Sequence, residues 1–235
     1  MTELLYLKDN YKKEFEATVT KADGKNILLD KTCFYPLSGG QPGDTGVIVA
    51  DGKEYKVLNT IKKGPGAIHE VDQEGIKEGD NITGMIDWSR RYHLMRSHTA
   101  CHILCLVVHN ETKALITGNQ ITDEKCRIDF NLENFDREQI QSFEKKANEI
   151  IEEGVDVSTK ILPKEEAFQI PDVLKLKNVL PPSIENIRVV DIEGYDIQAC
   201  GGTHVKNTQE IKGISITKVD NKGKNNRRIY FKLKD

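Results

Sequence analysis

The chain has 235 residues, 37% of them hydrophobic and 30% charged, a composition that supports a buried core and argues against disorder. The N-terminus lacks the layout of a signal peptide, and the longest apolar run, residues 103–108, is too short to cross a bilayer. We therefore expect a soluble cytoplasmic protein that makes no membrane contact. Its five cysteines have no disulfide-like spacing and are expected to be buried thiols, metal ligands or nucleophiles.

Charge is distributed unevenly along the chain. The formal net charge of −3 does not by itself indicate a nucleic-acid-binding protein. Residues 212–234, however, contain eight Lys or Arg and a single acidic residue, Asp220. A second basic group consists of Arg90, Arg91 and Arg96. Taken alone, both groups are better interpreted as solvated faces than as binding surfaces.

Residues 1–87 are predicted to form a small β-barrel domain. Short alternating runs at 14–19 and 55–58 indicate strands. Asp23-Gly24 and Asp51-Gly52 suit tight hairpin turns, since both residue types tolerate positive φ. Several short strands with regular turns favour a barrel.

Residues 88–235 are predicted to form an α+β domain, with helices packed on an antiparallel sheet. Helical spacing runs from Trp88 to about Asn110, and a second helix should begin after Asp136 and end at Gly154. A short helix is expected after Pro163. Strands are expected at 187–192, 211–219 and 228–233.

Two distant segments together predict a metal site. His98 and His102 lie four residues apart in the predicted long helix, so both imidazoles can reach one ion. In Cys200-Gly-Gly-Thr-His204, the glycines are expected to let a loop aim a thiolate and an imidazole at the same point. A Cys-His₃ set suits zinc. We therefore predict one Zn²⁺ per chain.

Other assignments at this site stay open. Thr99 stands where a zinc-protease helix has its glutamate, which disfavours peptidase chemistry. Cys105 is a reserve ligand, whereas His109 lies about 10 Å along the helix from His102 and is too far. Cys200 as a covalent nucleophile is a lesser alternative. Four protein ligands also leave open whether zinc activates water or only organises the pocket, because catalytic sites usually have three.

These segments resemble the editing domain of alanyl-tRNA synthetases and, more closely, the free-standing AlaX editing proteins. The glycine-rich stretch 34–46, the run Arg127-Ile-Asp-Phe130 and the C-terminal basic run fit the same layout. The resemblance spans nearly the whole chain and suggests the medium-length AlaX form, acting in trans. It implies a zinc-dependent hydrolase that deacylates mischarged alanine tRNA, carrying serine or glycine, without a nucleotide cofactor.

The resemblance also suggests contact residues. Gly39, Gly40 and Gln41 would cross the mouth of the editing pocket, unless they form only a strand-connecting loop. Thr117 is the candidate substrate contact, although the synthetases carry Gln and Gly-Ser in this segment. The candidates for RNA phosphate contacts are Lys222, Lys224, Arg227 and Arg228.

Two other functions remain as alternatives. The chain could be a non-catalytic RNA-binding module whose zinc is structural, or a zinc hydrolase of a small metabolite. The first predicts no ester hydrolysis with any charged tRNA. The second predicts activity on free amino-acid esters, with no dependence on the RNA body.

Overall fold

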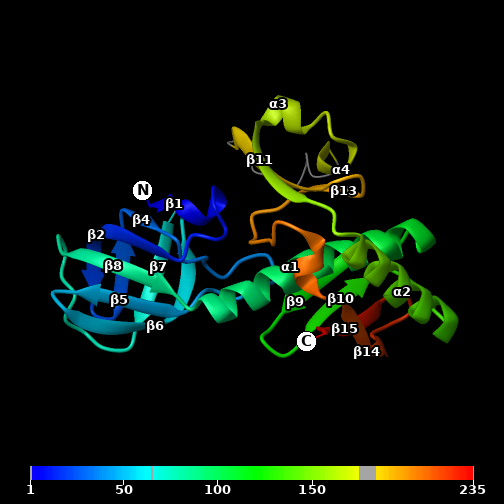
Figure 1. The fold of residues 1–235 in the computed structure, drawn as a ribbon, viewed down its shortest axis with the longest axis horizontal. Helices are drawn as coiled ribbons and strands as arrows, with labels where there is room; N and C mark the ends of the chain where they lie inside the picture. Colours follow the sequence, from blue (N-terminus) through cyan, green and yellow to red (C-terminus); the bar gives the residue numbers. More distant parts are fainter. Residues whose placement is uncertain (1, 65, 175–183, 235) are drawn as a thin grey trace. The chain divides into compact units, whose positions relative to one another are not determined.

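Six strands of the N-terminal half close into a barrel in the computed structural model, which describes residues 2–64, 66–174 and 184–234 (Figure 1). The strand order around the barrel is β2-β3-β7-β6-β5-β8. The strands are β2 (Glu14–Asp23), β3 (Asn26–Leu29), β5 (Gly46–Ala50), β6 (Lys53–Lys63), β7 (Gly66–Val71) and β8 (Asn81–Ile86). Closure leaves no exposed edge for unwanted pairing. The predicted small barrel is confirmed.

Alternation of side chains builds the barrel core. Along β2, Phe15, Ala17 and Val19 are buried while their neighbours face outward or lie partly exposed. Asp51 and Gly52 have φ of 48° and 74°, which gives the predicted tight turn between β5 and β6. The period-two pattern and the turn residues thus specify this half together.

A buried ion pair fastens the start of helix α1 (Trp88–Thr112) to the barrel unit. The guanidinium of Arg91 is fully buried and paired with the Asp44 carboxylate. It also donates to the carbonyls of Asn10 (3.0 Å) and Cys33 (2.7 Å). All the groups named here belong to one compact unit, Met1–Met95 with Ile121–Asp123.

The second unit, Arg96–Gln120 with Glu124–Asp235, contains the rest of α1 and a four-stranded sheet of order β14-β15-β10-β9. The strands of this sheet are β9 (Ile116–Ile121, whose last residue belongs to the first unit), β10 (Cys126–Phe130), β14 (Ile214–Asn221) and β15 (Arg227–Leu233). Helix α2 (Arg137–Glu153) is joined to β14 by two hydrogen bonds between Asn148 and the Ile214 backbone. The predicted α+β class is confirmed.

The ends of α2 follow the sequence signals. The Asp136 side chain accepts from the Gln139 N–H, and the Gln139 side chain accepts from the Asp136 N–H, which completes a capping box. Gly154 ends the helix in the left-handed conformation, with φ of 78°. Both predicted boundaries are confirmed.

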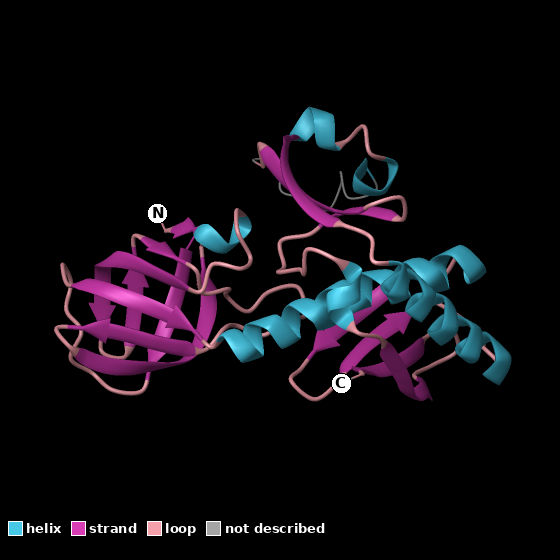
Figure 2. Ribbon diagram, in the orientation of Figure 1, coloured by secondary structure: helices cyan, strands magenta, loops and turns pink. Residues whose placement is uncertain are grey.

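A three-stranded antiparallel sheet completes this unit, in the order β11-β12-β13 (Figure 2). It contains β11 (Val157–Pro163), β12 (Asn186–Ile192) and β13 (Asp196–Ala199), with the short helices α3 (Lys164–Ala167) and α4 (Pro171–Leu174). Ala167 and Val173 from these helices pack on Ile187 and Val189 of β12. The short helix expected after Pro163 is therefore present.

One predicted strand begins later than expected. The apolar run from Ile211 predicts a strand over 211–219, but Thr208–Ile211 form the 3₁₀ helix η2 and β14 begins at Ile214. Asn207 and Glu210 make a capping box for η2, and Lys212 (φ 67°) and Gly213 (φ 117°) redirect the chain. Local capping therefore overrides the apolar pattern here.

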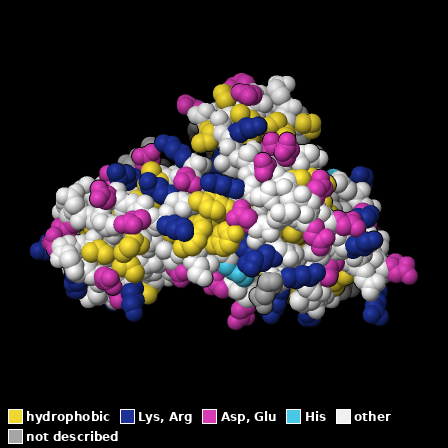
Figure 3. Space-filling view, viewed as in Figure 1, with side chains coloured by type: hydrophobic (Ala, Val, Ile, Leu, Met, Phe, Trp, Pro, Cys, Tyr) yellow, Lys and Arg dark blue, Asp and Glu magenta, His cyan; other side chains and the backbone are white. Residues whose placement is uncertain are grey.

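Charge is mixed on the surface drawn in Figure 3, where basic and acidic side chains are interspersed. Within the described ranges, no helix is long and apolar enough to span a membrane.

Candidate metal centre

Helix α1 and the segment after β13 bring four potential ligands together. His98 and His102 lie one helical turn apart on α1, and Cys200 and His204 belong to the loop that follows β13. The ligand atoms of all four lie within 4.8 Å of one another. The Cys200 Sγ is 3.7 Å from the His98 Nε2 and 3.4 Å from the His204 Nε2. One sulfur and three imidazole nitrogens at these separations can hold one metal ion.

Hydrogen bonds shape the Cys200 loop. The Gly202 N–H lies 3.4 Å from the Cys200 Sγ, the geometry of a weak hydrogen bond to sulfur. Neither Gly201 nor Gly202 is among the described residues with positive φ. The curl of this loop therefore does not depend on positive φ at its glycines.

Arg188 of β12 holds this loop from behind. Its Nη1 donates to the carbonyls of Cys200 (2.7 Å) and Gly202 (2.9 Å), and the Cys200 N–H donates to the Arg188 carbonyl at 3.1 Å. The arginine is 9% exposed. Arg188 was not predicted from the sequence, although a lone arginine inside the apolar run 187–192 is a usable signal, since a buried charge needs partners.

The outward nitrogens of two histidines face further side chains. The Nδ1 of His204 lies 3.1 Å from the Thr99 Oγ1, which also accepts from the Val205 N–H at 3.3 Å. The Nδ1 of His102 lies 3.7 Å from the Asp196 Oδ2, too far for a direct hydrogen bond. Both rings thereby leave Nε2 for the centre of the cluster.

The electrostatics of the site favour a thiolate. Burial disfavours the charged form of Cys200, but His98 and His204 outweigh it and hold the pKa of the thiol well below its usual value. Burial, together with His98, lowers the pKa of His204 to about 3. Burial also opposes charge on His102, yet Asp196 and Cys200 raise its pKa to about 10.

The rival ligands lie outside the cluster. Among the described residues, Cys105 and His109 are not part of the group of converging ligand atoms. Burial raises the pKa of Cys105 to about 12, which keeps it a neutral thiol. The His109 Nδ1 lies 3.0 Å from the Ala114 carbonyl.

The glycine-rich loop forms a tight turn on the barrel unit. The backbones of Ser38 and Gln41 exchange hydrogen bonds of 3.2 and 2.9 Å across Gly39 (φ 57°) and Gly40 (φ 83°). The Gly40 carbonyl accepts from the Ile121 N–H at 2.8 Å. The two glycines are exposed, while Gln41 is buried. A substrate role for this loop stays a prediction.

The other predicted contact residues lie in the second unit. Thr117 is exposed on β9. Lys222 and Lys224 are exposed in the turn between β14 and β15, and Lys222 lies 3.4 Å from the Asp220 carboxylate. Arg227 and Arg228 begin β15, where both have partners within the protein.

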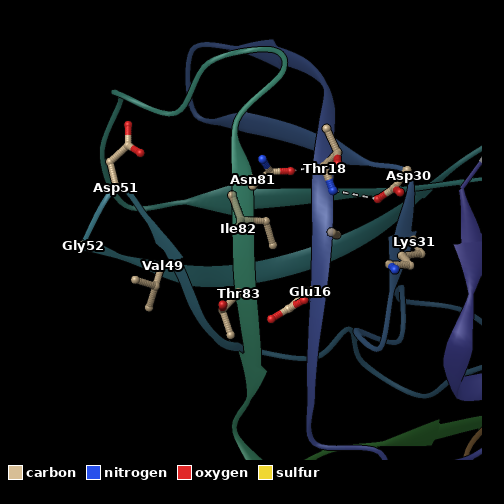
Figure 4. Close-up of a pocket in the computed structure, with 11 residues that line it drawn as sticks. Glu16, Thr18, Asp30, Lys31, Val49, Asp51, Gly52, Asn81, Ile82 and Thr83 are labelled. Carbon is tan, nitrogen blue, oxygen red and sulfur yellow. Dashed lines mark hydrogen bonds between the residues drawn. The ribbon is translucent and has the colours of Figure 1, made fainter.

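A shallow depression lies elsewhere, on the outer surface of the barrel (Figure 4). It has a volume of about 510 Å³ and contains none of the predicted site residues. Its wall includes Glu16, Asp30 and Lys31, and the Thr18 N–H donates to the Asp30 carboxylate at 2.8 Å. The Thr18 hydroxyl also donates to the Asn81 side chain at 3.2 Å across the paired strands β2 and β8, so part of the polar lining is satisfied within the barrel.

Comparison with known proteins first shows which class of protein this chain resembles. Residues 3–90 match the family of class II (A) tRNA synthetases, and residues 187–230, which include Cys200 and His204, match the second additional domain of threonyl and alanyl tRNA synthetases. The barrel and the metal-ligand loop are therefore of the kind found in these synthetases.

Full-length relatives identify the family. The chain is 49% identical to the alanyl-tRNA editing protein AlaX-M of Methanosarcina barkeri and 45% identical to that of Saccharolobus solfataricus, over 100% of each protein. It is 40% identical to the alanine–tRNA ligase of Pyrococcus abyssi over 98% of this chain and 26% of the ligase. The chain belongs to the AlaX-M family of alanyl-tRNA editing proteins.

Proposed function

We propose that the protein is an editing hydrolase that deacylates mischarged alanine tRNA at a zinc centre. Seryl-tRNA(Ala) is the proposed principal substrate and glycyl-tRNA(Ala) the second. The observation that carries the proposal is the convergence of His98, His102, Cys200 and His204 in a chain whose full-length relatives are named alanyl-tRNA editing proteins. Editing in trans, as by a free-standing protein, is part of the proposal, because the AlaX-M relatives are named as alanyl-tRNA editing proteins.

Zinc is the proposed ion because of the donor set. A thiolate with three imidazoles suits the borderline-soft Zn²⁺ better than the hard cations Mg²⁺ and Ca²⁺, which prefer oxygen. The lowered pKa of Cys200 supports this assignment, since the thiolate is the ligating form. When bound, zinc supplies Lewis-acid chemistry that can polarise an ester carbonyl or acidify water.

The chemistry of alanine selection explains the proposed substrate. An alanine pocket cannot exclude the smaller glycine by size, and an apolar pocket rejects an added hydroxyl only by about 10²-fold. Serine and glycine are therefore the expected errors, and a separate site must remove them. Thr117, with its exposed hydroxyl on β9, remains the proposed contact for the aminoacyl group.

Within this proposal, the protein's own groups hold the centre in place. Thr99 supports His204 through a 3.1 Å contact, and Arg188 fixes the carbonyls on either side of Gly201. The exposed turn of Gly39 and Gly40 and the basic residues near the C-terminus are the proposed contacts for the RNA.

A deacylation assay with two matched histidine variants tests the proposal. We expect zinc-loaded wild-type protein to release serine from Ser-tRNA(Ala), and His98→Ala to lose at least about 10²-fold in rate, because a missing ligand should cost more than a missing outer partner. His109→Ala, on the same helix but outside the cluster, should retain the wild-type rate.

The same assay separates the alternatives. Absence of hydrolysis by zinc-loaded wild-type protein that still binds tRNA would favour the RNA-binding module with a structural metal. Equal activity on the methyl ester of serine and on Ser-tRNA(Ala) would favour a hydrolase of small esters.

A further inference from the structure

The carboxylate of Asp196 faces the metal cluster from the strand that delivers Cys200. Asp196 begins β13, Ala199 ends it, and Cys200 follows directly. The Asp196 Oδ2 lies 3.7 Å from the Nδ1 of His102, and the two side chains are 5% and 10% exposed. A single short strand thus presents both a metal ligand and a buried carboxylate behind another ligand.

The Asp196 Oδ2 and the His102 Nδ1, which face each other, are both buried polar atoms. Neither atom makes a hydrogen bond within the described part of the chain. The second carboxylate oxygen, Oδ1, accepts from the Gln198 Nε2 at 3.1 Å, which fixes how the carboxylate is turned. A buried polar atom without a partner is costly, so an oriented pair of such atoms indicates a contact that closes when the site is loaded.

The net charge of the loaded metal site also favours a contact between Asp196 and His102. A divalent ion with one thiolate and three neutral imidazoles carries a net charge of about +1, which is unfavourable in a buried site without a counter-charge. The Asp196 carboxylate supplies that counter-charge. Thr99, the corresponding partner of His204, is uncharged.

We propose that Asp196 is a positioning residue for the metal centre. Its Oδ2 accepts a hydrogen bond from Nδ1–H of His102 in the loaded protein, which fixes the tautomer whose Nε2 faces the metal and tightens metal binding. This inference rests on the metal centre of the proposed function.

Zinc affinity measured by competition with a chromophoric chelator tests the inference. Asp196→Asn keeps the side-chain shape and removes the charge, and its Kd for Zn²⁺ should rise about 10- to 100-fold. Asp196→Ala, which also removes the acceptor, should bind more weakly still. Asp191→Asn is the matched control. Asp191 lies in the same sheet and pairs with Lys160, so this substitution should leave the Kd for Zn²⁺ unchanged.

The outcomes separate this inference from the proposed function. If wild-type protein binds zinc and Asp196→Asn binds it equally well, the role of Asp196 is overturned and the metal centre stands. If wild-type protein does not bind zinc, the metal centre itself is overturned.

A second measurement needs no buried substitution. Long-range ¹H–¹⁵N correlation spectra of the zinc-loaded wild-type protein should show His102 protonated at Nδ1, with a downfield proton protected from exchange. A His102 ring protonated at Nε2 instead would contradict the proposal, whatever the behaviour of the variants.

Discussion

Several charged side chains near the C-terminus are held by partners inside the protein. Arg228 makes two hydrogen bonds, of 2.6 and 2.8 Å, to the Asp129 carboxylate, which raises the pKa of the guanidinium and lowers that of Asp129. Arg227 is buried and donates to the Asn221 side chain and to the Gly223 and Asn226 carbonyls, so it holds the turn between β14 and β15. An RNA role for either arginine must act in addition to these contacts.

His69 makes stability depend on pH in the barrel. It is fully buried between the Thr32 hydroxyl (2.8 Å) and the Ile27 carbonyl (3.0 Å), and burial lowers its pKa to about 4. Unfolding returns the ring to water, where its pKa is about 6.5. The unfolded state therefore binds the proton first as the pH falls, and stability is lost between about pH 6.5 and 4.

When the pH falls from 7 to 5, we expect protonation of His69 in the unfolded state to lower the free energy of unfolding by about 2 kcal/mol. Urea denaturation at both pH values measures the loss. His69→Gln should remove that part of the pH dependence, whereas His109→Gln, at a half-buried site, should keep it. An unchanged pH dependence in His69→Gln would show that the pKa of His69 does not differ between the folded and unfolded states.

At the scale of elements, local signals were the most informative. Asp136 and Gly154 cap α2 through contacts and backbone angles that involve only nearby residues, so both ends of the helix could be predicted from sequence. The turn at Asp51-Gly52 is equally local. Strands β9, β10, β11 and β13 were not predicted. Their stability comes from pairing with partners distant in the chain, as in the register of Val157 with Ile192, which periodicity in a short segment does not reveal.

The same distinction holds at the metal centre. The spacing of His98 and His102 on one helix, and of Cys200 and His204 in one loop, could be seen from sequence. Behind them, Arg188 is signalled only as an arginine within an apolar run, which does not say what it contacts. Asp196 could not be seen, because it reaches the site through the pairing of β12 with β13.

Arg188 links β12 to the ligand loop, and its removal should loosen that loop. Arg188→Met keeps most of the side-chain volume but leaves the Cys200 and Gly202 carbonyls without their donor, which should cost on the order of 2 kcal/mol of unfolding free energy. Zinc affinity should fall as well. Arg188→Lys should restore part of both, since it supplies a cationic donor.

Denaturation and zinc competition on the same samples measure these effects. Arg137→Met, at the exposed first turn of α2, is the control and should match wild-type protein. Wild-type zinc affinity in Arg188→Met would mean that the loop keeps its shape without the arginine.

At the scale of the whole molecule, the exposed turn between β14 and β15 is the part of the basic C-terminal run best placed to meet RNA. Lys222 and Lys224 are exposed there, and Lys222 lies 3.4 Å from the partly buried Asp220 carboxylate. We expect Lys222→Ala/Lys224→Ala to weaken binding of charged and uncharged alanine tRNA alike, and to reduce the slope of log K against log salt by about 1 to 2.

Fluorescence anisotropy across a salt series measures that slope. The double variant Lys53→Ala/Lys56→Ala removes two exposed charges from the start of β6 and is the matched control. A slope equal to that of wild-type protein in Lys222→Ala/Lys224→Ala would exclude this turn from the RNA contact.

Zinc-dependent editing is best tested by the rate at which zinc-loaded protein releases the amino acid from Ser-tRNA(Ala), measured beside Ala-tRNA(Ala) under the same conditions. We expect rapid loss of serine, retention of alanine, and no loss of either with protein stripped of metal. Equal rates for the two charged tRNAs, or rapid loss of serine without metal, would contradict this expectation.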